Sequence, residues 1–447
     1  MNKQFDYFIK NFQLFYNLQD IEIEYGNGFD KGITIRQNCE DSFWSKQADI
    51  NIKNIVWKEW KGEKIPFLFE HINDENVKEI ITYKEDIAII NYDIVASAFY
   101  FLSGWNEYTN SSKDEFGRIT YANSIINTLN ISHIPIVNYY FSILEEAICQ
   151  VHKKKIRKKL WGDNHLAMAL THDIDTCMSC WLEGSFSELK KKRFYSIPQL
   201  IFKRIFARDD WFNFKTIVTL ERKYNATSSF YFLAQKGKVG KWKNSDYNIH
   251  SKSIQKAISF LKDEGKDVGI HGSFGTHANK EMLQKDISHI NLKSIIGNRF
   301  HFLMFDPAKT VSVLEDNGIK YDTTLSFAEQ IGFRRGTCFP FYLYNFEKDH
   351  SSSVLEIPLL VMDSSLLNKK YMGVNKEDAL QKVFKIIDEV EKHNGVFTLL
   401  WHNTFFSDYK YTGWREVYCS ILEYGIKKNG LLTNGKIIHD KITNEEI

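Results

Sequence analysis

The chain has 447 residues, enough for one large barrel with an accessory domain or for two to three smaller domains. Its composition, 43% hydrophobic and 26% charged, is typical of a soluble globular protein. With 58 basic and 56 acidic residues there is no overall charge to favour nucleic acid, and no recognition motif for nucleic acid is present.

The N-terminal segment gives no sign of export. It lacks the basic head, apolar core and small-residue cleavage site of a secretory signal. The longest apolar run, Ile94–Leu102, is about half as long as a membrane span. We therefore expect a cytoplasmic protein without a transmembrane helix. The six cysteines are too sparse for a disulfide framework, and the lone Cys177–Cys180 pair lacks the second pair of a zinc site.

Residues 1–150 read as an α+β accessory domain without a catalytic constellation. The region begins with apolar residues at helical spacing. A segment of alternating apolar and polar residues follows, as in a strand, and it ends at a turn signal. The expected elements are helices near residues 5–12, 92–105 and 137–151, and strands near 21–25, 80–83 and 87–90.

Two basic stretches follow this region. Lys153–Lys159 is a candidate domain boundary, since it precedes a change in pattern. The segment 190–208 interleaves lysine and arginine with aromatic residues. It reads either as a solvated surface or as a patch that contacts anionic lipid or a phosphate-bearing sugar carrier, which would make the protein membrane-peripheral.

From residue 165 onward, strand and helix patterns alternate. Helical spacing recurs between the strands, as in residues 254–261 and 380–390. Repeated strand–helix units predict a parallel sheet, and seven of them predict a distorted seven-stranded (β/α) barrel over residues 160–435. The expected strands are His165–Asp173, Thr227–Ala234, Asp267–His271, Gly297–Leu303, Ile319–Ser326, Val354–Met362 and Val396–His402.

Two carboxylates end the first of these strands. Asp173 and Asp175 are two residues apart, so they share one face of the strand, whereas His172 points to the other. Because neighbouring carboxylates repel, a cation or a proton must separate them. We therefore expect one to bind a metal and the other to act as a base. The plainer alternative is that both cap backbone amides at the strand end.

Histidines lie on or just beyond two further strands. His271 follows an apolar strand, His277 lies six residues later, and His301 is two residues past Arg299 on a strand, so that the two would share a face. One aspartate and two histidines suit Zn²⁺, with Co²⁺ or Mn²⁺ as alternatives. The spacing leaves open whether His277 or His301 completes the triad, with His301 slightly favoured.

The last strand ends in His402, which a closed barrel places beside the first strand, where it suits a general acid. Arg299 is expected to hold the base carboxylate in a bidentate pair, and Asp322 to orient Arg299 or a histidine. Weaker candidates for substrate contacts are Trp401, which could equally belong to the core, and Arg334 and Arg335, which could equally lie in a surface turn.

These residues resemble the motifs of the polysaccharide deacetylases, carbohydrate esterase family 4. Thr171–Asp175 (THDID) sits where the family has TFDDG, and Leu399–His402 is similar to its L-x-x-H motif. His271 with Ser273 matches the H-S/T-x-x-H motif in part, and Gly297–His301 looks like the arginine strand. The departures are Asp-x-Asp for Asp-Asp and the missing second histidine at four-residue spacing. The chain looks like a divergent branch with an extra N-terminal domain.

The resemblance implies a metal-dependent hydrolase that removes an acetyl group from an N- or O-acetylated sugar. Asp173 would be the base, Asp175 a metal ligand and His402 the acid. In the absence of an export signal, the substrate would be a nucleotide-linked or lipid-linked precursor or glycan intermediate. The alternatives are a hydrolase of another amide on the same barrel and a non-catalytic barrel that binds glycan or scaffolds an assembly.

Overall fold

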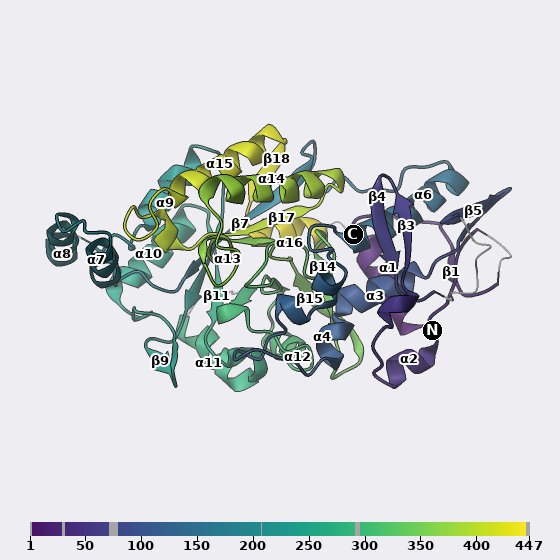
Figure 1. Ribbon diagram of the computed structural model, residues 1–447, viewed down its shortest axis with the longest axis horizontal. Coiled ribbons are helices and arrows are strands. Elements are labelled where there is room, and N and C mark those ends of the chain that lie inside the picture. Colours follow the sequence, from purple (N-terminus) through teal and green to yellow (C-terminus); the bar gives the residue numbers. More distant parts are fainter. Residues whose placement is uncertain (1, 29–31, 71–78, 207, 291–295, 444–447) are drawn as a thin grey trace.

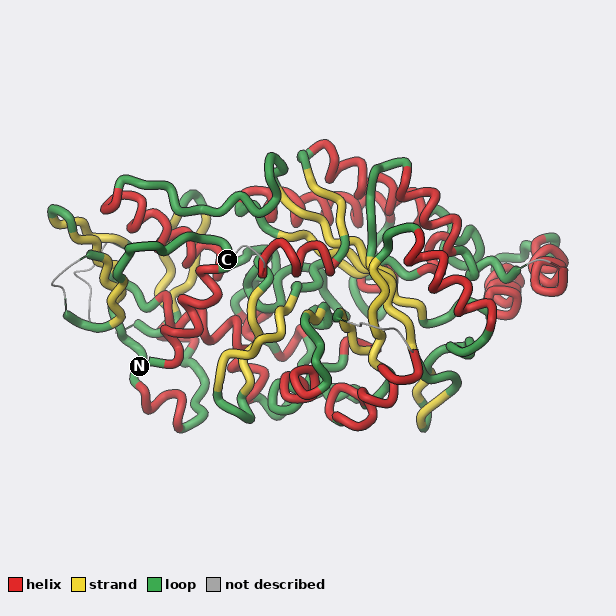
Figure 2. Tube along the Cα trace, turned by 180° about the vertical axis from the view of Figure 1, so that it is seen from behind, coloured by secondary structure: helices red, strands yellow, loops and turns green. Residues whose placement is uncertain are grey.

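The computed structural model describes residues 2–28, 32–70, 79–206, 208–290 and 296–443. The molecule is elongated, with α1, β1 and most of the first 150 residues at one end and a helical hairpin of residues 180–206 projecting at the other (Figure 1). Between them lies a large sheet, whose yellow strands run through the interior with red helices around them (Figure 2). No helix in these residues is long and apolar enough to cross a membrane.

The first region is α+β, with a four-stranded sheet in the order β1-β2-β6-β5 and a separate β3-β4 hairpin. Its elements are α1 (Lys3–Gln13), β1 (Ile23–Tyr25), β2 (Ile33–Ile35), α2 (Asp41–Ser45), η1 (Ile52–Asn54), β3 (Val56–Trp60), β4 (Glu63–Phe67), β5 (Ile81–Lys84), β6 (Ile87–Ile90), α3 (Ile94–Ser103), α4 (Trp105–Thr109), η2 (Tyr121–Asn123), α5 (Ile125–Thr128) and α6 (Ile136–His152). The helices and strands expected here from periodicity all have counterparts among them.

The large sheet has ten strands, in the order β14-β15-β13-β12-β11-β8-β7-β17-β16, with β18 pairing to β7. All its pairings are parallel except that of β14 with β15. The strands are β7 (Leu166–Ile174), β8 (Ser229–Leu233), β11 (Asp267–Gly272), β12 (Gly297–Phe300), β13 (Tyr321–Asp322), β14 (Phe341–Asn345), β15 (His350–Glu356), β16 (Val361–Met362), β17 (Val396–Leu400) and β18 (Gly430–Thr433). The α/β class with a mainly parallel sheet is confirmed, and the barrel count of seven strands stays a prediction.

One stretch of chain joins the two ends of the curled sheet. The expected strand Val354–Met362 is broken in two: β15 pairs with β13, and β16 pairs with β17 at the far end of the strand order. Between them, the Ile357 amide donates to Asp322 and the Leu360 amide to Thr398. The first and last expected strands, β7 and β17, are neighbours, as a closed barrel requires.

Helices surround this sheet, and several begin and end where the sequence signals. In α14 the Asn375 side chain caps the Asp378 amide, and α10 buries the expected apolar face, Ile254, Ala257, Ile258 and Leu261. The remaining elements are α7 (Cys180–Lys190), α8 (Ser196–Phe206), α9 (Phe214–Arg222), β9 (Lys238–Val239), β10 (Trp242–Lys243), α10 (Lys252–Asp263), η3 (Thr276–Ala278), α11 (Lys280–Ile290), η4 (His301–Leu303), α12 (Thr310–Asp316), α13 (Asp363–Leu367), α14 (Lys376–Lys392), η5 (Asn403–Phe406), α15 (Trp414–Lys427) and α16 (Gly435–Thr443).

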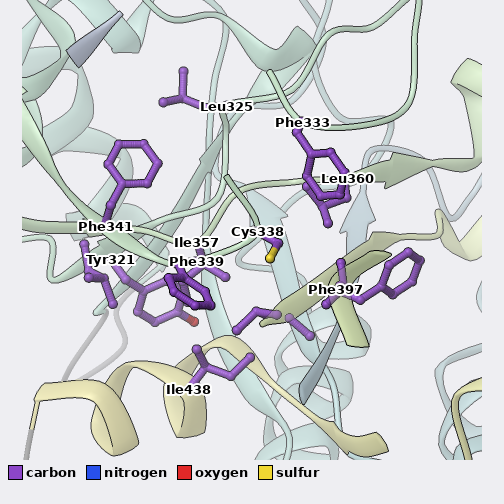
Figure 3. Close-up of a cluster of buried hydrophobic side chains, with 14 of the residues drawn as sticks. Tyr321, Leu325, Phe333, Cys338, Phe339, Phe341, Ile357, Leu360, Phe397 and Ile438 are labelled. Carbon is purple, nitrogen blue, oxygen red and sulfur yellow. The ribbon is translucent and has the colours of Figure 1, made fainter. Parts of the chain in front are cut away.

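The largest hydrophobic core among the described residues continues from the first region into the sheet. Phe15 stacks on Phe339 at 3.8 Å between ring centroids, and Tyr7 meets Tyr344 edge to face at 5.4 Å. Figure 3 shows the sheet side of this core, where Phe339 and Cys338 lie beside strand residues such as Phe397. Rings shared in this way bury apolar area of both regions at once, so each region stabilises the other.

A buried ion cluster reinforces the contact between the two regions. Glu107 of α4 accepts hydrogen bonds from Arg334 at 2.7 and 2.9 Å and from Arg335 at 3.2 Å. Burial raises the pKa of Glu107, but the two guanidiniums outweigh it and the net shift is downward. Gly104, which separates α3 from α4 at φ 74°, must be glycine, because a Cβ there would lie 1.3 Å from Arg335 Nη1.

We expect Glu107→Ala to destabilise the fold by about 3–5 kcal/mol, because it leaves two guanidiniums buried without their carboxylate. The measurement is chemical denaturation of the full chain. Glu115→Ala is the matched control, since Glu115 and its partner Lys241 are 60% and 70% exposed, and it should change stability by less than about 0.5 kcal/mol. Equal effects of the two substitutions would contradict the assignment.

Candidate metal centre and active site

Five of the predicted side chains meet at the carboxyl ends of the parallel strands. Asp173 ends β7, with Asp175 just beyond it, and His271 lies near the end of β11. His301 follows β12 and His402 follows β17. All five line one cavity of about 390 Å³. Gathering at this edge follows from the topology, because parallel strands end on the same side of a sheet.

Asp175, His271 and His301 form the group best suited to a metal ion. Asp175 Oδ1 lies 3.2 Å from His271 Nε2 and 3.6 Å from His301 Nδ1, and the two imidazole nitrogens are 3.1 Å apart. In the part of the chain that the structure describes, these three form the one cluster of metal-binding side chains. An aspartate and two histidines at this separation match the donor set of a catalytic zinc site.

Hydrogen bonds outside the group turn each imidazole toward it. His271 Nδ1 lies 2.7 Å from the Arg299 carbonyl, and His301 Nε2 lies 3.0 Å from the Lys243 carbonyl. Each of these nitrogens must carry the hydrogen, because a carbonyl only accepts. The nitrogens that face Asp175 are thereby left with lone pairs, which is the usual support for histidine ligands.

The lone pairs and the negative charge in the site favour a bound cation. Two facing lone pairs 3.1 Å apart repel unless a proton or metal ion lies between them. Asp175 Oδ1 is buried and has no hydrogen-bond partner among the described residues. Burial raises the pKa of Asp175, but His301, His271 and His402 outweigh it and the pKa falls well below its usual range. An ionised carboxylate with an unsatisfied oxygen fits a divalent ion.

The structure brings His301 into this group and leaves His277 outside it. His277 lies in η3 with its ring 6.3 Å from that of Phe300, and burial lowers its pKa to about 4. It does not line the cavity. One expectation was wrong: His301 is not on a strand sharing a face with Arg299, because β12 ends at Phe300 and His301 opens the turn η4.

Asp173 lies beside the group and is held by an arginine. Its Oδ1 accepts from Arg299 Nη1 at 3.0 Å, and its Oδ2 lies 3.7 Å from His271 Nε2. The expected bidentate pair is absent, because Arg299 Nη1 also donates to Thr171 and Arg299 Nε donates to the Thr323 carbonyl. A single N–H leaves Asp173 Oδ2 turned toward the cavity, where a base would need it.

His402 completes the site together with a residue that the sequence analysis missed. Its Nδ1 lies 2.8 Å from Asp363 Oδ1, and its Nε2 lies 3.6 Å from Asp175 Oδ2. Burial would lower the pKa of His402, but the Asp363 carboxylate, with Asp175 and Asp173, raises it to about 10. Asp363 follows directly on the expected strand Val354–Met362, and that position was the signal that could have revealed it.

The first region also reaches the site, which the sequence gave no reason to expect. Arg118 lines the cavity, is braced by Asp114 at 2.7 Å, and donates from Nη1 to the Phe302 carbonyl. Phe302 and Leu303 have φ values of 59° and 55°, a strained backbone for residues with side chains. The Phe302 ring lies 3.8 Å from that of His301. Arg118 therefore holds the strained turn that carries a candidate ligand.

The remaining candidates for orienting or substrate contacts do not face the cavity. Asp322 accepts from Asn298 at 2.6 Å and from Thr324, and does not orient Arg299. Trp401 is fully buried against Trp414 and Tyr418. Arg334 and Arg335, expected near the mouth, are instead buried at Glu107. These four side chains serve packing and internal pairing.

Comparison with known proteins gives partial and distant matches. A family model described as a family of unknown function, DUF7033, matches residues 2–153. No curated protein matches. A structure described as a polysaccharide deacetylase from Mycobacterium smegmatis is 14% identical, with a TM-score of 0.43 over 64% of this chain and 93% of that one.

Two further solved structures are similar at the same level. One from Pseudomonas aeruginosa PAO1, also described as a polysaccharide deacetylase, is 12% identical, with a TM-score of 0.40 over 64% of this chain and 93% of that one. A pseudoenzyme of the CE4 family from Bacillus anthracis is 11% identical, with a TM-score of 0.31 over 62% of this chain and 66% of that one. Structural similarity this distant supports no conclusion about the reaction, which depends on the residues of the cavity.

We expect the full chain to bind about one Zn²⁺, as a three-ligand site does. Asp175→Asn, His271→Ala and His301→Ala should each abolish stoichiometric binding, measured by equilibrium dialysis and elemental analysis. His277→Ala is the matched control, because His277 is a half-buried histidine outside the group, and it should retain the ion. Retention in all three ligand variants would rule out this centre.

We expect Arg118→Ala to weaken Zn²⁺ binding by about tenfold, because a hydrogen bond that supports the turn next to a metal ligand is worth that much. Metal titration of the purified variant measures the effect. Lys241→Ala is the control. It removes an exposed cation that pairs with Glu115, three residues before Arg118 in the chain, and it should leave the Zn²⁺ affinity unchanged. An unchanged affinity in Arg118→Ala would mean that the Phe302 turn holds His301 without help.

Proposed function

We propose that the protein is a metal-dependent hydrolase that removes an acetyl group from an N- or O-acetylated sugar. One observation supports the proposal most strongly: a single cavity is lined by the Asp175–His271–His301 group and by two further side chains. These are Asp173, which pairs with Arg299, and His402, which pairs with Asp363. The resemblance of Thr171–Asp175 and Leu399–His402 to polysaccharide deacetylase motifs supports the same chemistry. Residues 160–435 would be the catalytic domain, and 1–150 an accessory domain.

The metal ligands would be Asp175, His271 and His301. When bound, a divalent ion, Zn²⁺ with Co²⁺ or Mn²⁺ as alternatives, supplies Lewis acidity toward the acetyl carbonyl and lowers the pKa of water in the site. His271 and His301 offer their free nitrogens because carbonyls hold the others.

Asp173 would act as the general base. It needs to stay ionised and to keep one oxygen toward the attacking water. Arg299 stabilises the ionised carboxylate by donating to Asp173 Oδ1, which leaves Asp173 Oδ2 for the attacking water. Because Arg299 is itself fixed by Thr171 and the Thr323 carbonyl, it cannot follow the substrate and holds Asp173 in one place.

His402 would protonate the leaving group. Its Nδ1 is held by Asp363, so its Nε2 is presented to the cavity. The Asp363 carboxylate raises the pKa of His402, which favours the protonated ring that a general acid needs. A cationic acid on one side of the bond and a carboxylate base on the other is the arrangement that amide or ester hydrolysis needs.

The proposed substrate is an acetylated sugar, in a precursor or a glycan intermediate, met in the cytoplasm. We also retain as a proposal the peripheral contact of residues 190–208 with an anionic membrane, since that segment has seven basic residues and no acidic one. The proposal includes no nucleic-acid partner.

We expect Asp173→Asn to lower kcat for acetate release by about 10²- to 10⁴-fold, the usual worth of a general base. The asparagine keeps the shape and cannot take a proton, so metal content should not change. The assay uses acetylated sugar nucleotides and chitooligosaccharides with the Zn²⁺-loaded protein. Glu115→Gln, a charge removal on the exposed surface, should keep wild-type activity.

Two outcomes would redirect the proposal. A metal-loaded wild type that releases no acetate from any of these sugars but cleaves another amide would assign the same residues to a different substrate. A protein that binds the sugars without turnover, whether or not Asp173 is replaced, would make the barrel a glycan-binding module.

A further inference from the structure

The exposed apolar surface of this chain is concentrated in one element. Of the thirteen large hydrophobic side chains exposed in the described residues, nine lie in the α7–α8 hairpin, residues 180–206. They are Trp181, Leu182, Phe186, Leu189, Phe194, Tyr195, Ile201, Phe202 and Ile205. A patch of this kind marks a binding surface, because scattered single apolar residues are the norm elsewhere.

The hairpin is anchored to the body by a different face. Cys180 and Leu200 pack with Trp211 in a small core of their own, and Asp209 accepts from the amides of Cys180 and Trp181. Gly184 lies against Leu200. The inward face is therefore already occupied, and Leu182, Phe186 and Leu189 form a second stripe, spaced i, i+4, i+7, on the outside of α7.

Positive charge follows this outer stripe along the chain, and one of the basic residues, Lys203, pairs with Asp210 at 2.6 Å. Residues 189–208 contain seven of the 58 basic residues and none of the 56 acidic ones. Glu188, which precedes them, is buried and pairs with Lys191. In Figure 1 the hairpin projects from the molecule at the end away from α1 and β1, and its outer apolar side chains are exposed among the described residues. Exposed aromatic and aliphatic side chains next to lysine and arginine suit the surface of an anionic bilayer, where the apolar groups enter the headgroup region and the basic groups contact the lipid phosphates.

We propose that the α7–α8 hairpin docks the protein on an anionic membrane surface, with the aromatic side chains entering the headgroup region and the basic ones contacting lipid phosphates. A second copy of the chain is the competing occupant. Protein interfaces are depleted in lysine, however, and the like charges of two such hairpins would repel. The charge pattern therefore favours lipid.

Docking would bring the mouth of the cavity to the membrane. Glu183 of α7 lines the cavity and pairs with Lys410 and Lys243, which line it too. The base of the hairpin is thus part of the cavity rim. The substrate is accordingly a sugar carried by a membrane-anchored lipid, an assignment that rests on the deacetylase function proposed above.

The docking is tested by flotation of the full chain with vesicles of phosphatidylcholine alone or mixed with phosphatidylglycerol. We expect flotation only with the anionic vesicles, and weaker flotation at high salt. Phe194→Ser with Ile205→Ser, and separately Lys192→Glu with Arg204→Glu, should each weaken it by at least tenfold. Tyr83→Ser with Ile426→Ser replaces two exposed apolar residues elsewhere, 42% and 45% exposed, and should change nothing.

Flotation that is absent, or equal for neutral and anionic vesicles, would overturn the proposal. Concentration-dependent dimers in light scattering that disappear in the hairpin variants, without vesicle binding, would assign the surface to a second copy instead.

The substrate class is tested with one acetylated sugar in two forms, free in solution and attached to a lipid in anionic vesicles. We expect the hairpin variants to lose at least tenfold in rate on the lipid-attached form and to keep wild-type rates on the soluble form. Equal rates of the wild type and the hairpin variants on the vesicles would refute the membrane-anchored substrate. Vesicle binding without deacetylation of either form would leave the docking standing and refute the proposed function.

Discussion

Negative charge at the end of a buried strand is the constraint on which the site depends. β7 is fully buried over its length, with Asp173 next to its last residue and Asp175 just beyond it, where two carboxylates could not stay ionised without positive partners. Arg299 compensates Asp173, and His271, His301 and His402 surround Asp175. Each partner comes from a strand end or the turn after it, so the order of the strands in the sheet assembles the site.

The opposite face of β7 shows how firmly this strand is fixed. His172, which directly precedes Asp173, points to the other face of the strand and contacts Glu221 at 2.9 Å and the Trp401 carbonyl at 2.6 Å. Glu221 is buried and also pairs with Lys266 at 2.7 Å. Burial raises the pKa of Glu221, but His172 and Lys266 outweigh it and bring it to about 2. A satisfied polar network under the strand holds the register that aims Asp173 and Asp175 into the cavity.

Sequence patterns predicted those parts of the fold that depend on residues close together in the chain. Strand ends in a parallel sheet meet at one edge, so Asp173, Asp175, His271 and His402 could be grouped from chain order alone. The end of β12 could not be placed, because a strained turn at Phe302 and Leu303 is stabilised by Arg118, more than 180 positions away. Likewise Arg334 and Arg335 looked like a loop at the mouth, since nothing near them in sequence reveals Glu107. Long-range partners decided each of these cases.

The Arg118 contact has a consequence for how this architecture can diversify. A module that only adds binding surface can be exchanged or lost while the catalytic half continues to work. Here the first region supplies both the carboxylate that neutralises Arg334 and the side chain that holds the turn after His301. Substitutions in one half must therefore be matched in the other, so the two halves are constrained to change together and to be inherited as one unit.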